Sequence, residues 1–188
     1  MRMRTSDLWS AVSSVSETIA CFNYDLPSTA AILQRAVDAY IHVFLDTLYM
    51  RSSTPDVLQR LGRQYRLGLI TNFAYPPGAY QLLDRYRLAA YFDTIVVSGE
   101  VGWKKPANQI FATALSNLSI EPKDAVYVGD EYEADMVGAK NAGMHTVYLS
   151  CEPDARDTID VTIRLLTELP LALTTLGPRP FSVRNSHH

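Results

Sequence analysis

Short apolar runs rich in β-branched residues recur through the middle and later parts of the chain, and such runs are typical of buried parallel strands. The predicted strands are residues 67–71, 94–98, 125–129 and 145–149. Between them, apolar residues recur at helical spacing in residues 77–87 and 108–118, and small residues in 135–142 predict a short helix that Gly143 ends. Strands that alternate with helices predict an α/β fold with a doubly wound parallel sheet and helices on both faces.

The first 65 residues have a different, mostly helical pattern. Ser28 is a plausible N-cap for a long amphipathic helix that reaches Leu48. Thr54-Pro55 begins another helix, with the proline at its first position.

These patterns suggest three parts of the chain. We expect residues 1–53 to be a helical segment that forms part of a cap over the sheet. Residues 54–176 should be the α/β core, and residues 177–188, which end in two histidines, a loose tail.

Composition narrows the classes of protein. The chain has 188 residues, of which 47% are hydrophobic and 20% charged, as in an ordinary globular domain. The net charge is −3 and the basic residues are scattered, so we expect no nucleic-acid partner and no binding to anionic membranes. No apolar run approaches the ~20 residues of a membrane span. Two isolated cysteines, Cys21 and Cys151, favour a reducing compartment, and we expect a cytoplasmic protein.

Polar residues follow the predicted strands at the edge of the sheet where ligands collect. Thr71-Asn72 ends the first strand, Lys104-Lys105 follows the second, and Asp130 ends the third, with Asp135 five positions later. Singly, the threonine or the aspartate could cap a helix and the lysines could be solvated loop charges. Their ordered occurrence at successive strand ends favours a site for an anionic group beside a divalent cation, because carboxylate oxygens suit Mg²⁺.

Three stretches resemble the second, third and fourth motifs of the haloacid dehalogenase superfamily. They are residues 69–72, residues 102–106 running on to Ile110-Phe111, and residues 128–130 with Asp135, Gly138-Ala139 and residues 142–144. Their order and spacing fit this superfamily over about residues 54–150. The resemblance implies a Rossmann-like hydrolase of the phosphatase branch, with a helical cap, acting on a small phosphorylated molecule.

The resemblance also implies a role for each matching residue. Thr71 would bind the transferring phosphoryl group with Asn72 beside it, and Lys105 would pair with the nucleophile and the phosphate. Asp130 would ligate Mg²⁺, and Asp135 would support the metal or orient Lys105. In this mechanism an aspartate attacks phosphorus in line, and water hydrolyses the aspartyl-phosphate.

The superfamily's first motif, Asp-x-Asp-x-Thr, is absent from this sequence. The nearest match is Asp25-Leu26-Pro27-Ser28-Thr29, in which Pro27 replaces the second aspartate and cannot act as an acid or base. Either Asp25 belongs to a degenerate motif, or residues 1–65 belong to the cap and the first strand lies upstream of Met1. We favour the second interpretation. Since the family places that strand centrally, we expect two strands that face a gap, and a chain that is marginally stable or self-associating.

Two other functions remain open at this point. One is a metal-free 2-haloacid dehalogenase, although that branch lacks a metal-binding carboxylate at the position of Asp130. The other is a catalytically dead module that binds a phosphate-bearing ligand or a partner protein, as the missing nucleophile motif suggests.

Overall fold

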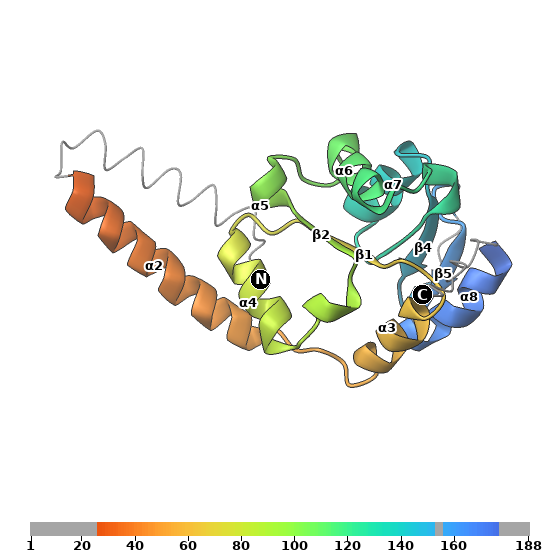
Figure 1. The fold of residues 1–188 in the computed structure, drawn as a ribbon, viewed down its shortest axis with the longest axis horizontal. Coiled ribbons are helices and arrows are strands. Elements are labelled where there is room, and N and C mark those ends of the chain that lie inside the picture. Colours follow the sequence, from red (N-terminus) through yellow and green to blue (C-terminus); the bar gives the residue numbers. More distant parts are fainter. Residues whose placement is uncertain (1–25, 153–155, 177–188) are drawn as a thin grey trace, which may run out of the picture.

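The structure is a computed structural model that describes residues 26–152 and 156–176 (Figure 1). Asp25 and the tail 177–188 lie outside the described residues. The strands are β1 (Gly68–Thr71), β2 (Thr94–Val97), β3 (Val126–Gly129), β4 (His145–Leu149) and β5 (Val161–Ile163). The helices are α2 (Leu26–Thr47), α3 (Thr54–Gly62), α4 (Pro76–Arg85), α5 (Ser98–Val101), α6 (Asn108–Leu118), α7 (Gly138–Asn141) and α8 (Leu169–Leu176). Three short 3₁₀ turns lie at Ala89–Tyr91, Pro122–Asp124 and Leu166–Glu168.

The predicted parallel α/β fold is confirmed. The four predicted strands are β1 to β4, and the predicted helices 77–87 and 108–118 correspond to α4 and α6. Every strand pairing among the described residues is parallel, as expected for strands joined through helices. The sequence analysis did not predict β5, which has three residues and pairs with the end of β4.

The described strands form two sheets, one of order β1-β2 and one of order β3-β4-β5. Leu69 lies opposite Ile95 in the first sheet, and Tyr127 lies opposite Thr146 in the second. Within the described ranges, no strand pairing joins β1 to β3. One edge of each of these two strands is therefore without a strand partner in the described part of the chain.

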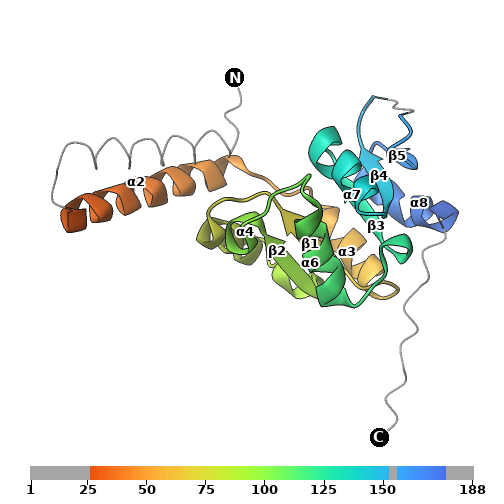
Figure 2. The same ribbon diagram turned by 90° about the horizontal axis from the view of Figure 1, so that it is seen from above.

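Helices cover both faces because side chains alternate along each strand. In β3, Tyr127 faces a core that contains Ile110 and Phe111 of α6. Its neighbours Val126 and Val128 face a second core, formed mainly by α3 and α8. Figure 1 shows α6 above the strands and α8 at their lower right, and Figure 2 shows α2 projecting away from the body.

Helix α2 begins earlier than the sequence pattern suggested. Its described part runs from Leu26, so Ser28 lies inside the helix and the prediction that it is the N-cap is wrong. The C-terminal half of α2 packs through Ile41 and Leu45 against a core that includes Phe73.

Side chains from α4 and from the residues directly before and after it hold α2. Tyr75 donates its hydroxyl proton to Asp38 over 2.7 Å. Arg85 donates to the Leu45 carbonyl at 2.9 Å and to the Asp46 carboxylate at 2.8 Å. The Tyr86 hydroxyl donates to the Leu48 carbonyl at 2.7 Å. Since the last turn of α2 carries no basic residue of its own, Arg85 supplies the positive charge that a helix C-terminus favours.

The predicted helix 135–142 is only partly correct. A π-helical segment covers Tyr132–Val137, and α7 continues it to Asn141. Within this wide turn, the Asp135 side chain folds back onto the backbone at the end of β3. Gly143 ends the helix with a φ of 82°, as the sequence predicted. Among the described residues, no helix is both long and apolar enough to cross a membrane.

Candidate active site

A buried ion pair lies at the carboxyl end of the strands. Lys105 stands in the loop between α5 and α6, and its Nζ lies 2.6 Å from Oδ1 of Asp135. The side chains are 11% and 4% exposed, so neither charge is fully solvated. A pair desolvated to this degree requires good geometry and further hydrogen bonds to be stable.

The other oxygen of Asp135 organises the loop that follows β3. Its Oδ2 accepts the backbone N–H groups of Asp130 at 3.1 Å and Glu131 at 3.0 Å. Gly129 permits this approach, because a Cβ at that position would overlap the Asp135 carboxylate. Both oxygens of Asp135 are therefore engaged with the protein.

Asn72 connects the end of β1 to the same loop as Lys105. Its Nδ2 donates to the Lys105 carbonyl at 3.0 Å, and its Oδ1 accepts the Lys105 backbone N–H at 2.7 Å. The structure thus places Asn72 and Lys105 together, as the sequence analysis expected. Its amide serves the loop backbone, whereas the analysis assigned it to substrate binding.

Tyr127 belongs to this cluster and was missed by the sequence analysis. Its hydroxyl accepts from Nζ of Lys105 at 3.0 Å and donates to Oδ1 of Asp135 at 3.2 Å. Burial raises the pKa of this hydroxyl well above its ordinary value, and the Asp135 carboxylate raises it further. The hydroxyl therefore keeps its proton. Strand alternation puts Tyr127 on the same face as Gly129, but this pattern does not reveal how far the hydroxyl reaches.

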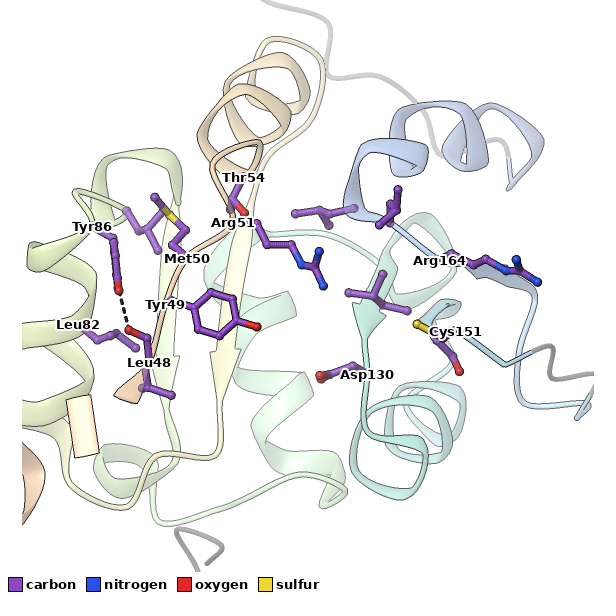
Figure 3. Close-up of a pocket in the computed structure, with 15 residues that line it drawn as sticks. Leu48, Tyr49, Met50, Arg51, Thr54, Leu82, Tyr86, Asp130, Cys151 and Arg164 are labelled. Atoms are coloured by element: carbon purple, nitrogen blue, oxygen red, sulfur yellow. Dashed lines mark hydrogen bonds between the residues drawn. The ribbon is translucent and has the colours of Figure 1, made fainter. Parts of the chain in front are cut away.

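Thr71 and Asp130 occupy the two sides of the split between the sheets. Thr71 is the half-buried last residue of β1 and lies opposite Val97. Asp130 is exposed after β3 and lines an open pocket of about 550 Å³, to which both halves of the molecule contribute residues. Figure 3 shows Tyr49 and Asp130 on opposite walls, with Arg51 reaching into the pocket.

The donor set for a metal ion is incomplete in the part of the chain that the structure describes. No group of three or more His, Cys, Asp or Glu side chains there could hold a metal. Asp130 offers an exposed carboxylate. Asp135, the second predicted ligand, is occupied by Lys105, Tyr127 and two backbone amides. Mg²⁺ is bound through one or two carboxylates and several waters, so Asp130 is suited to be one ligand but does not make a site alone.

A parallel α/β fold with a lysine–aspartate pair at the carboxyl ends of its strands has polar side chains in the region where ligands of such folds bind. Comparison with known families is more specific. Residues 13–149 match the family described as haloacid dehalogenase-like hydrolase, and the chain belongs to this family.

Several curated relatives are phosphatases by name. The glyceraldehyde 3-phosphate phosphatase of Pyrococcus furiosus is 34% identical over 137 residues, which cover 69% of this chain and 55% of the relative. The ribulose-1,5-bisphosphate 5-phosphatase of Halopiger xanaduensis is 34% identical over a match that covers 65% of this chain and 52% of the relative. The chain thus spans about half the length of these relatives.

Solved structures show the same fold. A haloacid dehalogenase-type phosphatase from Thermococcus onnurineus matches with a TM-score of 0.64 and 29% identity, over 75% of this chain and 64% of the other. The 2-haloacid dehalogenase from Pseudomonas syringae pv. Tomato DC3000 has a TM-score of 0.73 at 22% identity, over 93% and 82%. The second match is a likeness of fold alone.

Proposed function

We propose that this chain is the core of a Mg²⁺-dependent phosphatase that acts on a small phosphorylated molecule. The observation that carries the proposal is the Lys105–Asp135 ion pair, buried at the strand ends where Thr71 and Asp130 also lie. The names of the curated relatives support a phosphorylated substrate.

Each residue has a role that its surroundings suit. Thr71 donates its hydroxyl proton to a phosphoryl oxygen, and Lys105 neutralises charge on the same group. Asp130, exposed beside the pocket, provides one ligand for Mg²⁺, which when bound neutralises further phosphate charge. Asp135 orients Lys105 and shapes the loop at Asp130, since both of its oxygens are already engaged. Asn72 positions the loop between α5 and α6 that carries Lys105.

The nucleophile is the open element of this proposal. Asp25 lies outside the described residues, so the described geometry supports binding and charge neutralisation and contains no attack step. A second candidate function is therefore a module that binds a phosphate-bearing ligand without turnover. The lack of a strand pairing between β1 and β3 within the described ranges favours it. The carboxylate of Asp130 weighs against a metal-free dehalogenase.

Hydrolysis of a generic aryl phosphate, measured with Mg²⁺ and with EDTA, tests the proposal. We compare the wild type with Asp25→Asn, Asp130→Asn and Lys105→Gln, and use Lys104→Gln as the matched control, because Lys104 is its exposed neighbour. Loss of a nucleophile, a metal ligand or the phosphate-binding lysine should lower the rate by orders of magnitude. Turnover that survives in EDTA contradicts the role of Mg²⁺.

The pattern among the variants decides between the two candidate functions. Mg²⁺-dependent turnover that is lost in Asp25→Asn identifies Asp25 as the nucleophile and overturns our interpretation of the missing strand. No turnover in any protein, together with Mg²⁺-dependent binding of inorganic phosphate, supports the binding module. Equal activity in Lys104→Gln and Lys105→Gln contradicts the assigned site.

A further inference from the structure

The Tyr127 hydroxyl completes a triangle with the two charged groups of the site. The sides of this triangle are 2.6 Å between Lys105 Nζ and Asp135 Oδ1, 3.0 Å between Nζ and the hydroxyl, and 3.2 Å between the hydroxyl and Oδ1. The three residues come from β3, from the loop before α6 and from the π-helical segment. Three separate parts of the fold therefore meet at one lysine nitrogen.

The protons of this triangle can be assigned from its donors and acceptors. The ammonium group of Lys105 has three N–H donors. One points to Asp135 and one to the tyrosine oxygen, so a single N–H remains for a ligand. The hydroxyl proton is directed to Asp135, which leaves the tyrosine oxygen free to accept from Lys105.

We propose that Tyr127 is a positioning residue that fixes the direction of the one N–H by which Lys105 binds a phosphoryl group or another tetrahedral oxyanion. This inference rests on the proposed function, since it names the residue that aims the phosphate-binding lysine of that site. Asp135 alone fixes one of the three N–H directions. Two fixed directions orient the whole ammonium group, because its three N–H bonds have tetrahedral geometry.

The ring and the hydroxyl of Tyr127 make separate sets of contacts. The ring packs edge-on against Phe111, with the centroids 5.2 Å apart, inside the core beneath α6. The hydroxyl extends past that core to the ion pair. Tyr127→Phe keeps the packing and removes only the contact with Lys105 and Asp135. The matched control is Tyr86→Phe, which also loses a hydroxyl and one hydrogen bond, at the Leu48 carbonyl.

Reductive methylation tests the positioning without any need for catalysis. Formaldehyde and borohydride modify lysine amines, and fragmentation in a mass spectrometer resolves Lys105 from exposed Lys104, the internal reference. In Tyr127→Phe we expect the rate ratio of Lys105 to Lys104 to rise about three- to tenfold, because one restraining hydrogen bond is lost. Tyr86→Phe should leave the ratio at its wild-type value. An unchanged ratio in Tyr127→Phe overturns the proposal.

Kinetics on the aryl phosphate provide the second measurement. If Tyr127 positions Lys105, Tyr127→Phe should lower kcat about three- to tenfold with a smaller change in KM. If the hydroxyl has only a structural role, the variant should have a lower melting temperature and unchanged kcat and KM. Equal kcat in Tyr127→Phe and the wild type overturns the positioning role. If the wild type shows no turnover and the methylation ratio still rises, the proposed phosphatase function fails while the inference about Tyr127 stands.

Discussion

Asn72 and Lys105 hold each other through two reciprocal hydrogen bonds, from Nδ2 to the carbonyl oxygen and from the backbone N–H to Oδ1. Their positions are 33 apart in the sequence, and the bonds tie the end of β1 to the loop after β2. The Asn72 amide thus satisfies both the backbone donor and the backbone acceptor of Lys105, as a neighbouring strand would. The position of the lysine depends on this contact.

Asn72→Ala should lower the free energy of unfolding by about 2 kcal/mol, because two partly buried hydrogen bonds of about 1 kcal/mol each are lost. Urea denaturation measures the change. Asn117→Ala is the control, since its side chain makes a single bond, to the Thr94 hydroxyl at 3.0 Å. An effect of Asn72→Ala no larger than that of the control would show that the reciprocal pair adds nothing.

Asp135→Asn should destabilise the fold by about 3 kcal/mol or more, because it leaves the charge of Lys105 without its partner in a site only 11% exposed. The control is Asp46→Asn, which breaks the solvated pair with Arg85 and should cost less than about 1 kcal/mol. Both values come from urea denaturation at neutral pH. Similar losses in the two variants would contradict a desolvated ion pair.

Asp160 should make stability depend on pH in the acid range. Burial alone would raise its pKa, but hydrogen bonds from Lys140 and from the backbone of Thr146 outweigh burial and hold the pKa below its ordinary value. A carboxyl with a lowered folded-state pKa stabilises the fold above its unfolded pKa of about 4, and this contribution disappears as the pH falls through the folded value. His145, 3.7 Å away, also faces this carboxylate.

The wild type should therefore be more stable than Asp160→Asn at neutral pH, and the difference should shrink below about pH 4. Denaturant titrations of both proteins at several pH values measure the difference. A gap that stays constant from pH 7 to pH 3 would show that the ionised form of Asp160 contributes no stability.

In the described part of the chain, β1 and β3 each have one edge without a strand partner. Such edges should make the chain marginally stable or self-associating, since open strand edges pair with other chains. Analytical ultracentrifugation over a range of concentrations should show oligomers, or thermal unfolding should begin at low temperature. A monomer with a sharp two-state transition at high temperature would contradict this prediction.

The parts of the fold that the sequence predicted are those governed by local patterns. The runs 94–98 and 145–149 became β2 and β4 because continuous apolar runs in an α/β chain have to be buried on both faces. Pro55 and Gly143 marked helix ends through backbone geometry that needs no tertiary contact. The strand β5 was missed because three residues carry too little pattern to distinguish a strand from a loop.

The candidate site was predictable in its charged residues and not in its supporting ones. Lys105 and Asp135 stood at strand ends in a recognisable order, and the structure brings them together. The role of Tyr127 depends on the exact reach of a hydroxyl across two other elements, which no one-dimensional pattern contains. The two hydrogen bonds between Asn72 and the backbone of Lys105 were likewise not predictable, because the sequence suggests only that the two residues are neighbours.

The contacts of Tyr75, Arg85 and Tyr86 fasten α2 to α4 near Asp38 and again at Leu45 to Leu48. Ile41 and Leu45 of α2 also pack in one core with Val97 of β2, so the helix is anchored to the first sheet as well. The segment 72–75 joins β1 to α4 and begins with Asn72, whose amide holds the backbone of Lys105. One short segment therefore connects the helix pair and the loop that carries Lys105 to the same strand.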